Sequence, residues 1–232
     1  MLSLARAFDR LSRTGTLLTG ATLLASWALT VRPALAQVSL DQGIVGTGLQ
    51  LRGLDGEKRV LMIGAHPDDE DTALLTALAR GMGASTAYLS LTRGDGGQNL
   101  IGPELGEGLG AVRTGELLAA RSLDGGDQFF TRAFDYGFSK SADEALAMWP
   151  REELLRDVVW VVRTFRPQVI VSIFSGTPAD GHGQHQAAGI MAREVFDAAA
   201  DPTRFPELTA LGAAPWQVGK LDRRAWGDDA TQ

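Results

Sequence analysis

A short apolar segment that stops abruptly at polar residues constrains this chain more than any other feature. Residues 60–64 form a continuous apolar run, which is typical of a buried strand. Residues 72–79 then repeat their apolar positions with the period of a helix. A polar turn, His66 to Glu70, lies between them. The pattern predicts a strand–turn–helix unit with this turn at the carboxyl end of the strand, where open α/β sheets bind ligands.

The polar turn carries side chains that can hold a divalent metal. Pro67 suits the first position of a helix, where no N–H is needed. His66 and Asp69 are three residues apart, so both can face one point at the start of that helix. An imidazole and a carboxylate are ligands that zinc accepts. Asp68 must then point elsewhere and could stay unligated beside the metal. Acids in a first helical turn often only cap the helix, and the acids alone favour that interpretation.

The positions of the histidines favour the metal interpretation. The chain has three histidines, His66, His182 and His185. The last two follow a second predicted buried strand, 169–174, and precede a predicted helix, 186–199. Because the carboxyl ends of parallel strands lie at one edge of a sheet, the three imidazoles can converge there. The sequence therefore predicts one metal site that is shared by the two turns.

Two motifs carry a resemblance to a known family. Ala65 to Glu70, together with the later Gly181-His182-x-x-His185, is similar to the LmbE/PIG-L family of zinc-dependent N-acetylglucosaminyl de-N-acetylases, over about residues 58–200. The resemblance implies an α/β, Rossmann-like fold, with a mostly parallel sheet and helices on both faces. It also implies zinc-dependent hydrolysis of the acetamide of an N-acetylated amino sugar or glycoconjugate, which releases acetate and a free amine.

The resemblance also implies a role for each motif residue. The implied zinc ligands are His66, Asp69 and His185, the implied general base is Asp68, and the implied group at the substrate oxygen is His182. The family often has an aspartate before the last histidine of the second motif, where this chain has Gln184. A glutamine cannot stabilise an imidazolium by charge. Either His182 is a weaker base here, or Asp180 orients it instead.

Two further segments are candidates for substrate binding. The glycine-rich segment 92–99 is similar to a Thr-x-Gly-x-x-Gly segment of the family, which makes Asp95 a candidate substrate contact. A flexible glycine turn is the other interpretation. Arg113, in the predicted helix 111–121, matches an arginine that faces the substrate in the family. An exposed ion pair with Glu116 is the other interpretation of that arginine.

The first 36 residues have the pattern of an export signal. Three arginines precede an apolar run, 16–31, and small residues at 34–36 form a cleavage site. The run is shorter than the ~20 residues that a spanning helix needs, so cleavage is favoured over a retained anchor. We expect a mature chain that starts at Gln37, is exported to the periplasm or the exterior, and has no stable membrane span.

The remaining sequence fits one globular domain. We expect an irregular, glycine-rich lead-in at 37–58 and a deacetylase-like domain at 59–232. The domain is similar to long exported members of the family, in which this domain is followed by others. The possibility that this chain is truncated at its C-terminus therefore stays open. The first 36 residues carry four arginines and one aspartate, which leaves a net charge of −9 on the remainder of a chain whose net charge is −6. Such an acidic body argues against nucleic acid as a partner. The absence of cysteine excludes disulfides and thiolate metal sites.

Strands and helices alternate through the rest of the domain. Beyond the units above, the patterns predict strands at 85–91 and 127–131, an amphipathic helix at 150–165, a loop at 201–215 and an edge strand at 216–221. The aromatic segment 134–138 lies between elements, and ordinary packing is favoured there over a sugar-stacking surface.

Two other functions fit parts of the pattern. His66-x-Asp68 with a distant histidine also fits the facial triad of a mononuclear iron oxygenase, although that chemistry usually occurs on an all-β jelly roll. The second alternative is a non-catalytic sugar- or metal-binding domain on the same scaffold, an alternative that Gln184 in the second motif keeps open.

Overall fold

The structure is a computed structural model that describes residues 42–54 and 58–224. The predicted export signal lies outside the described residues. In chain order the elements are α2 (Gly43–Gly53), β1 (Arg59–Gly64), α3 (Thr72–Thr76), the π-helical turn η1 (Ala77–Gly81), β2 (Ser85–Ser90), α4 (Glu107–Asp124), β3 (Asp127–Phe130), α5 (Ala142–Met148), α6 (Arg151–Phe165), β4 (Val169–Ser172), the 3-10 turn η2 (Pro178–Asp180), α7 (Gly183–Ala198), α8 (Pro206–Ala210) and β5 (Lys220–Arg223).

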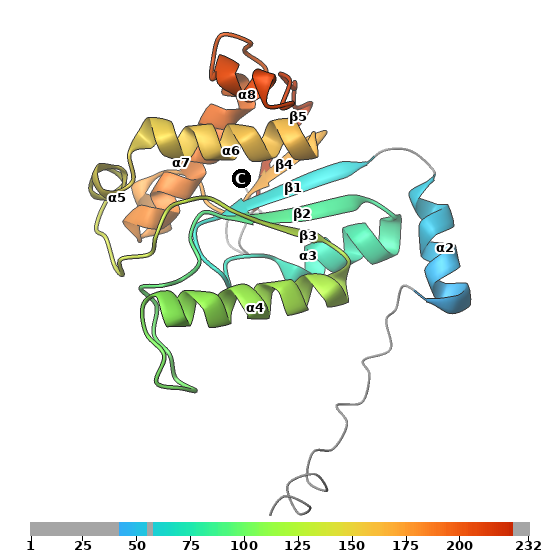
Figure 1. Cartoon of the computed structure of the whole chain (residues 1–232), viewed down its shortest axis with the longest axis horizontal. Coiled ribbons are helices and arrows are strands. Elements are labelled where there is room, and N and C mark those ends of the chain that lie inside the picture. The colour runs from blue at the N-terminus through green and yellow to red at the C-terminus, as the bar shows by residue number, and fades with distance from the viewer. Residues whose placement is uncertain (1–41, 55–57, 225–232) are drawn as a thin grey trace, which may run out of the picture. The chain divides into compact units, whose positions relative to one another are not determined.

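Five strands form one parallel sheet in the order β3–β2–β1–β4–β5 (Figure 1). In the central strand, Met62 is in register with Tyr88 of β2 and with Val171 of β4. The chain places β2 and β3 on one side of β1 and then returns to place β4 and β5 on the other side. The strand order therefore reverses between β1 and β4, which is the position where sheets of this kind bind ligands.

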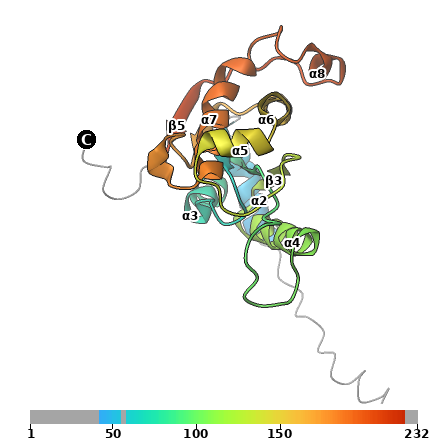
Figure 2. The same cartoon turned by 90° about the vertical axis from the view of Figure 1, so that its left-hand side faces the viewer.

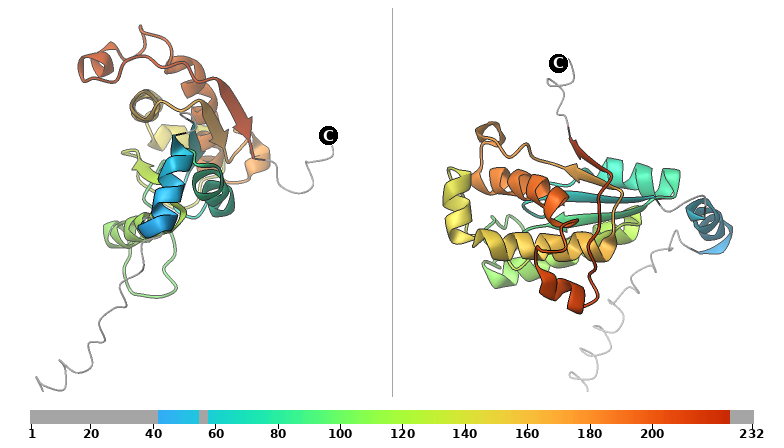
Figure 3. Two further views of the ribbon diagram at one scale, coloured as in Figure 1. Left: turned by 90° about the vertical axis from the view of Figure 1, so that its right-hand side faces the viewer. Right: turned by 90° about the horizontal axis from the view of Figure 1, so that it is seen from above.

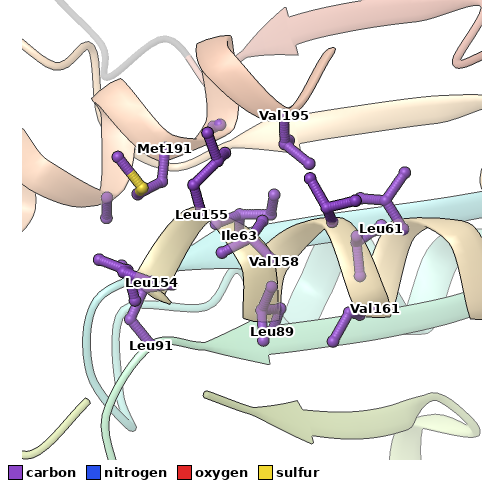
Figure 4. Close-up of a cluster of buried hydrophobic side chains, with 14 of the residues drawn as sticks. Leu61, Ile63, Leu89, Leu91, Leu154, Leu155, Val158, Val161, Met191 and Val195 are labelled. Carbon is purple, nitrogen blue, oxygen red and sulfur yellow. The ribbon is translucent and has the colours of Figure 1, made fainter. Parts of the chain in front are cut away.

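Alternate residues of the central strand pack into two separate layers of the core. Leu61 and Ile63 of β1 pack in the layer that contains α6 and α7, as Figure 4 shows. Met62 packs on the opposite face, with Leu75 of α3 and Leu117 of α4. Helices thus cover both faces of the sheet, with α3 and α4 on one face and α6 and α7 on the other (Figures 2 and 3). This arrangement confirms the predicted fold class.

The helix after β1 begins at Thr72, as the periodicity of residues 72–79 predicted, but the expectation that Pro67 occupies its first position was wrong. Pro67 is not its first residue, because α3 starts at Thr72 and is capped by Asp71, whose Oδ1 accepts the N–H of Leu74 at 3.0 Å. Asp68 has a φ of +107°, which no residue inside a helix adopts. The segment 66–70 is therefore a turn between strand and helix, and His66 and Asp69 meet through that turn.

The two ends of the described chain also differ from the expectation. The lead-in, expected to be irregular, contains α2, and Arg52 at its end donates to the carbonyl oxygens of Arg80 and Gly81 at 3.1 and 2.8 Å. The segment 201–215, expected to be a loop, contains the short helix α8. The predicted edge strand forms as β5, a few residues later than expected. No helix in the described ranges is long and apolar enough to cross a membrane.

Candidate metal centre

Backbone contacts hold the turn after β1 in place. Asp69 Oδ2 accepts the N–H groups of Ala65 at 2.9 Å and of His66 at 2.7 Å. Tyr88 of β2 donates its hydroxyl to the carbonyl oxygen of His66 at 2.6 Å. Gly64 makes room for that hydroxyl, because a Cβ at this position would lie 2.4 Å from Tyr88 Oη. The sheet itself therefore positions the imidazole and the carboxylate of this turn.

The turn before α7 presents the second pair of histidines. His182 caps the helix, and its Nδ1 accepts the N–H of Gln184 at 3.1 Å. The role considered for Asp180, orientation of the His182 ring by its carboxylate, is not what the structure shows. The main-chain carbonyl oxygen of Asp180 accepts the N–H of His182 at 2.8 Å. Its carboxylate instead accepts three backbone N–H groups of the 175–177 loop at 2.9, 2.7 and 3.2 Å. Asp180 thus shapes the loop that leads from β4 to the helix.

All three histidines of the chain meet at the reversal point of the sheet. The ring centroids of His66, His182 and His185 lie 4.9 to 5.3 Å apart. His66 Nδ1 is 3.5 Å from Asp69 Oδ2, and His185 Nε2 is 3.6 Å from Asp69 Oδ1. The His185 ring also stacks on Phe174 with a centroid distance of 4.0 Å. One ligand atom from each of His66, Asp69 and His185 lies within 4.8 Å of the other two.

These three residues fit a divalent metal. Two imidazole nitrogens and one carboxylate oxygen, with a further position open, form the donor set of a catalytic zinc site. Two ligands on one zinc ion lie about 3.3 Å apart, given metal–ligand distances of about 2.0 to 2.1 Å. The separations of 3.5 and 3.6 Å, each to a different carboxylate oxygen of Asp69, are close to that value. Asp68 is outside this group, so the carboxylate beside the two imidazoles is that of Asp69 and not the Asp68 considered for an iron oxygenase.

Asp68 faces Arg113 of α4. Arg113 Nη2 donates to Asp68 Oδ2 at 2.7 Å and to the carbonyl oxygen of Pro67 at 2.6 Å. The Asp68 side chain is 68% exposed. The backbone N–H of Asp68 donates to Glu70 Oε2 at 3.0 Å. Arg113 is therefore paired with Asp68, not with Glu116. The pairing brings a predicted base and a predicted substrate contact together.

Burial and neighbouring charges shift the pKa values of the three histidines and of Asp69. Burial is the largest influence on the pKa of His66 and lowers it, but the hydrogen bond and charge of Asp69 outweigh it, so the pKa is raised overall. Burial acts to raise the pKa of Asp69, but His66 and His185 lower it below its ordinary value. Burial lowers the pKa of His185 against the charge of Asp69. Burial and the charges of His66 and His185 lower the pKa of His182, which favours a neutral ring there.

The segment 135–139 contributes to the site, although ordinary packing was favoured for the aromatic residues 134–138 over a sugar-stacking surface. Ser139 Oγ lies 3.3 Å from His182 Nδ1. Asp135 is 8% exposed, and its charge acts on His66 and His182. Phe138 is 70% exposed, with its ring centroid 5.0 Å from that of His182. The segment follows β3, so the end-of-strand rule that located the histidines could have located it too.

Asp95 lies in the loop after β2 but faces the protein scaffold. Its Oδ2 accepts the N–H of Asp135 at 3.5 Å. Its Oδ1 fills the space beside Gly110 of α4, where a Cβ would lie 2.1 Å from it. Asp95 thus supports the loop that carries Asp135, and its contact with a substrate stays a prediction.

Fold and site together define an α/β protein that has a His–Asp–His group, suited to a divalent metal, at the reversal point of a parallel sheet. Such a protein presents its ligand site on loops at the carboxyl edge of the strands. The chain belongs to the family described as PIG-L: GlcNAc-PI de-N-acetylase, which matches residues 61–196. That range contains both histidine motifs.

The chain is also similar to curated relatives. One is a 1D-myo-inositol 2-acetamido-2-deoxy-alpha-D-glucopyranoside deacetylase of Geodermatophilus obscurus, 36% identical over 182 residues that cover 71% of this chain and 60% of the relative. Another carries the same name in Kineococcus radiotolerans and is 33% identical over 201 residues, covering 74% of this chain and 53% of the relative. The chain therefore spans less than two thirds of the length of these relatives.

Solved structures share the fold at low sequence identity. The N,N'-diacetylchitobiose deacetylase from Pyrococcus horikoshii superposes with a TM-score of 0.58 at 22% identity, covering 78% of this chain and 64% of that one. GalB, the 4-carboxy-2-hydroxymuconate hydratase of Pseudomonas putida, gives 0.52 at 18% identity, covering 71% and 64%. The names of the two proteins describe different reactions, so this likeness supports the fold and leaves the activity to the site residues.

Proposed function

We propose that this chain hydrolyses the acetamide of an N-acetylated amino sugar or glycoconjugate, with zinc as its metal, and releases acetate and a free amine. The observation that carries the proposal is the convergence of His66, Asp69 and His185 within 4.8 Å at the reversal point of the sheet. Two relatives that are 36% and 33% identical are named as deacetylases of an acetamido sugar, which supports the substrate class.

His66, Asp69 and His185 would hold the zinc ion. A bound zinc ion supplies Lewis acidity, which polarises a carbonyl oxygen and lowers the pKa of a water molecule to about 7. Asp69 also stabilises the turn, because its Oδ2 accepts the N–H groups of Ala65 and His66. These hydrogen bonds hold its carboxylate in place beside the two imidazoles, whose hydrogen bond and charges lower its pKa and keep it ionised, the state that a ligand needs.

Asp68 is the proposed general base. It is adjacent to the ligand Asp69 but outside the ligand group, so its carboxylate keeps free lone pairs. Arg113 engages one of its oxygens at 2.7 Å, and the side chain is 68% exposed. The carboxylate can therefore take a proton from the attacking water and later return it to the departing amine.

His182 is the proposed hydrogen-bond donor to the substrate oxygen. Its Nδ1 accepts the N–H of Gln184, so the neutral ring carries its hydrogen on Nε2. A neutral imidazole in this tautomer can donate to an oxygen that gains negative charge. The lowered pKa of His182, caused by burial and by His66 and His185, is compatible with this role. The substitution of Gln184 for an aspartate does not remove that donor.

Arg113 and Asp95 are the proposed contacts of the sugar. Arg113 supports the proposal through its position beside Asp68, where a polar substrate group could replace the carboxylate as its partner. Asp95 is half-buried in the loop after β2, so any contact would use the exposed part of its side chain.

Acetate release from a panel of N-acetyl glycosides, with and without a chelator, tests the function. We expect at least one substrate to yield equimolar acetate and amine, and we expect chelation to stop the reaction. A zinc-loaded protein that is inert towards the whole panel would favour the non-catalytic binding domain instead.

We further propose that the chain is exported and that its mature form starts at Gln37. The pattern of residues 1–36 supports this proposal. Mass spectrometry of the protein from a producing cell should find the new N-terminus outside the cytoplasm. An intact Met1 on exported protein would contradict the cleavage.

A further inference from the structure

Gln184 is a fully buried polar side chain in contact with a candidate metal ligand. It is the second residue of α7, and its exposed fraction is 0%. Its Oε1 lies 2.6 Å from His66 Nε2. Its Nε2 donates to the carbonyl oxygen of Gly137 at 2.8 Å. The amide therefore bridges the segment after β3 and the turn after β1, while lying outside the ligand group itself.

The contact with Gly137 determines which way round the amide lies. A carbonyl oxygen can only accept, so the NH₂ group of Gln184 must face Gly137 and the Oε1 must face His66. Oε1 also can only accept, so the His66 ring must carry a hydrogen on Nε2. In the neutral ring the lone pair is then on Nδ1. This is the nitrogen that lies 3.5 Å from Asp69 Oδ2.

We propose that Gln184 is a positioning residue of the metal centre, which holds His66 in the tautomer that presents Nδ1 to the ion. The inference rests on the proposed metal site. It departs from what the family resemblance implies, because there the matching aspartate supports the histidine that corresponds to His182. A second hydrogen bond of this kind fixes the ring orientation and the basicity of a metal-bound histidine, and its loss weakens metal affinity about 10- to 100-fold.

Zinc affinity of the full chain, measured by competition with a chromophoric chelator, tests the proposal. Gln184→Leu removes both polar ends at similar volume, and we expect it to bind zinc about 10- to 100-fold more weakly than the parent. Gln184→Glu keeps an acceptor towards His66, and we expect it to recover most of the parent affinity. The visible spectrum of the cobalt-substituted protein should change in Gln184→Leu and stay parent-like in Gln184→Glu.

Gln186 offers a matched control on the same helix. It is 5% exposed, its Oε1 accepts the N–H of Ala142 at 3.2 Å, and its Nε2 donates to the carbonyl oxygen of Gly181 at 3.4 Å. Gln186→Leu thus removes a comparable buried amide that has no contact with His66. We expect it to lose stability and keep the parent zinc affinity. Equal affinity losses in the two leucine variants, or parent affinity in Gln184→Leu, would overturn the proposal.

A measurement on the parent protein needs no variant to fold. Long-range ¹H–¹⁵N correlation spectra of the metal-free protein at alkaline pH, where the ring is neutral, report which nitrogen of His66 carries the hydrogen. We expect a protonated Nε2 and a lone pair on Nδ1, and the opposite tautomer would overturn the proposal. A parent protein that bound no zinc would defeat the proposed function, whereas this spectrum would still decide whether Gln184 fixes the tautomer of His66.

Discussion

Arg113 and Asp68, 45 positions apart in the sequence, form an ion pair with an Nη2–Oδ2 distance of 2.7 Å. The same guanidinium nitrogen donates to the carbonyl oxygen of Pro67 at 2.6 Å. Asp68 has a φ of +107°, a backbone conformation that residues other than glycine rarely adopt. Arg113 therefore stabilises both the charge and the backbone of this turn. The pair links α4 to the candidate base, which makes each of the two residues a target for substitution.

Asp68→Asn should lower kcat for acetate release about 10²- to 10⁴-fold, because the amide cannot accept the proton from the attacking water. Asparagine tolerates a positive φ, so the turn should keep its shape. Zinc content, measured by elemental analysis, should match that of the parent because Asp68 lies outside the ligand group. Parent turnover in this variant would remove Asp68 from the mechanism.

Arg113→Met should lower kcat/KM about 10- to 100-fold, the effect of losing a charged hydrogen bond worth about 1.5 to 3 kcal/mol. Steady-state kinetics of the purified variant will show it. A rise in KM alone would indicate substrate binding, and a fall in kcat would indicate that Asp68 is misplaced. Arg93→Met is the control, because Arg93 contacts Thr114 and the Phe130 ring instead. If both variants keep the parent kcat/KM, Arg113 has neither role.

His185→Ala and His182→Ala should separate metal binding from chemistry. His185 belongs to the ligand group and His182 does not. We expect His185→Ala to lose zinc and activity together, and His182→Ala to keep zinc and lose activity. Dialysis against a chelator should inactivate the parent, and added zinc should restore the parent but not His185→Ala. Retention of full zinc content by His185→Ala would contradict the proposed ligand set.

Arg121→Met should destabilise the fold by about 3 to 5 kcal/mol, because it leaves two buried carboxylates without their cation. Arg121 Nη2 lies 2.6 Å from Asp124 Oδ2 and 3.3 Å from Glu70 Oε1, and these side chains are 3 to 5% exposed. Arg132→Met, which breaks an exposed pair with Asp157, should cost no more than about 1 kcal/mol. Urea unfolding measures both. Equal losses of unfolding free energy in the two variants would show that the buried ion pairs of Arg121 stabilise the fold no more than the pair of Arg132.

Gly64→Ala should destabilise the protein by about 1 to 3 kcal/mol, because the added methyl overlaps a filled space. That Cβ would lie 2.4 Å from Tyr88 Oη. Adding Tyr88→Phe removes the overlapping oxygen, so the double variant should lose less than the sum of the two single variants. Thermal or urea unfolding of the four proteins tests this, and strict additivity would rule out the contact as the cause.

Local sequence pattern was sufficient to predict most of the fold. The apolar runs at 60–64 and 169–174 predicted two buried strands, and the motifs that follow them meet, as expected, at one edge of the sheet. The structure adds that the two strands are neighbours. Pro67 was wrongly expected at the start of the helix because the positive φ of Asp68 is a property of the turn, and the helical periodicity of residues 72–79 does not reveal it. The helix α2 was missed because its glycine-rich sequence has weak helical preference of its own.

The sequence by itself determined the strands and the longer helices around the sheet, that three histidines stand at strand ends, and which residue types are available to hold a metal. It could do so because burial periodicity and end-of-strand position are local properties of the chain. Only the tertiary structure decided that Gln184 contacts His66, across 118 positions, and that Asp68 contacts Arg113. Those contacts depend on how segments distant in the sequence pack against one another. A glutamine or an arginine can form hydrogen bonds with many different partners, so its residue type alone does not identify the partner.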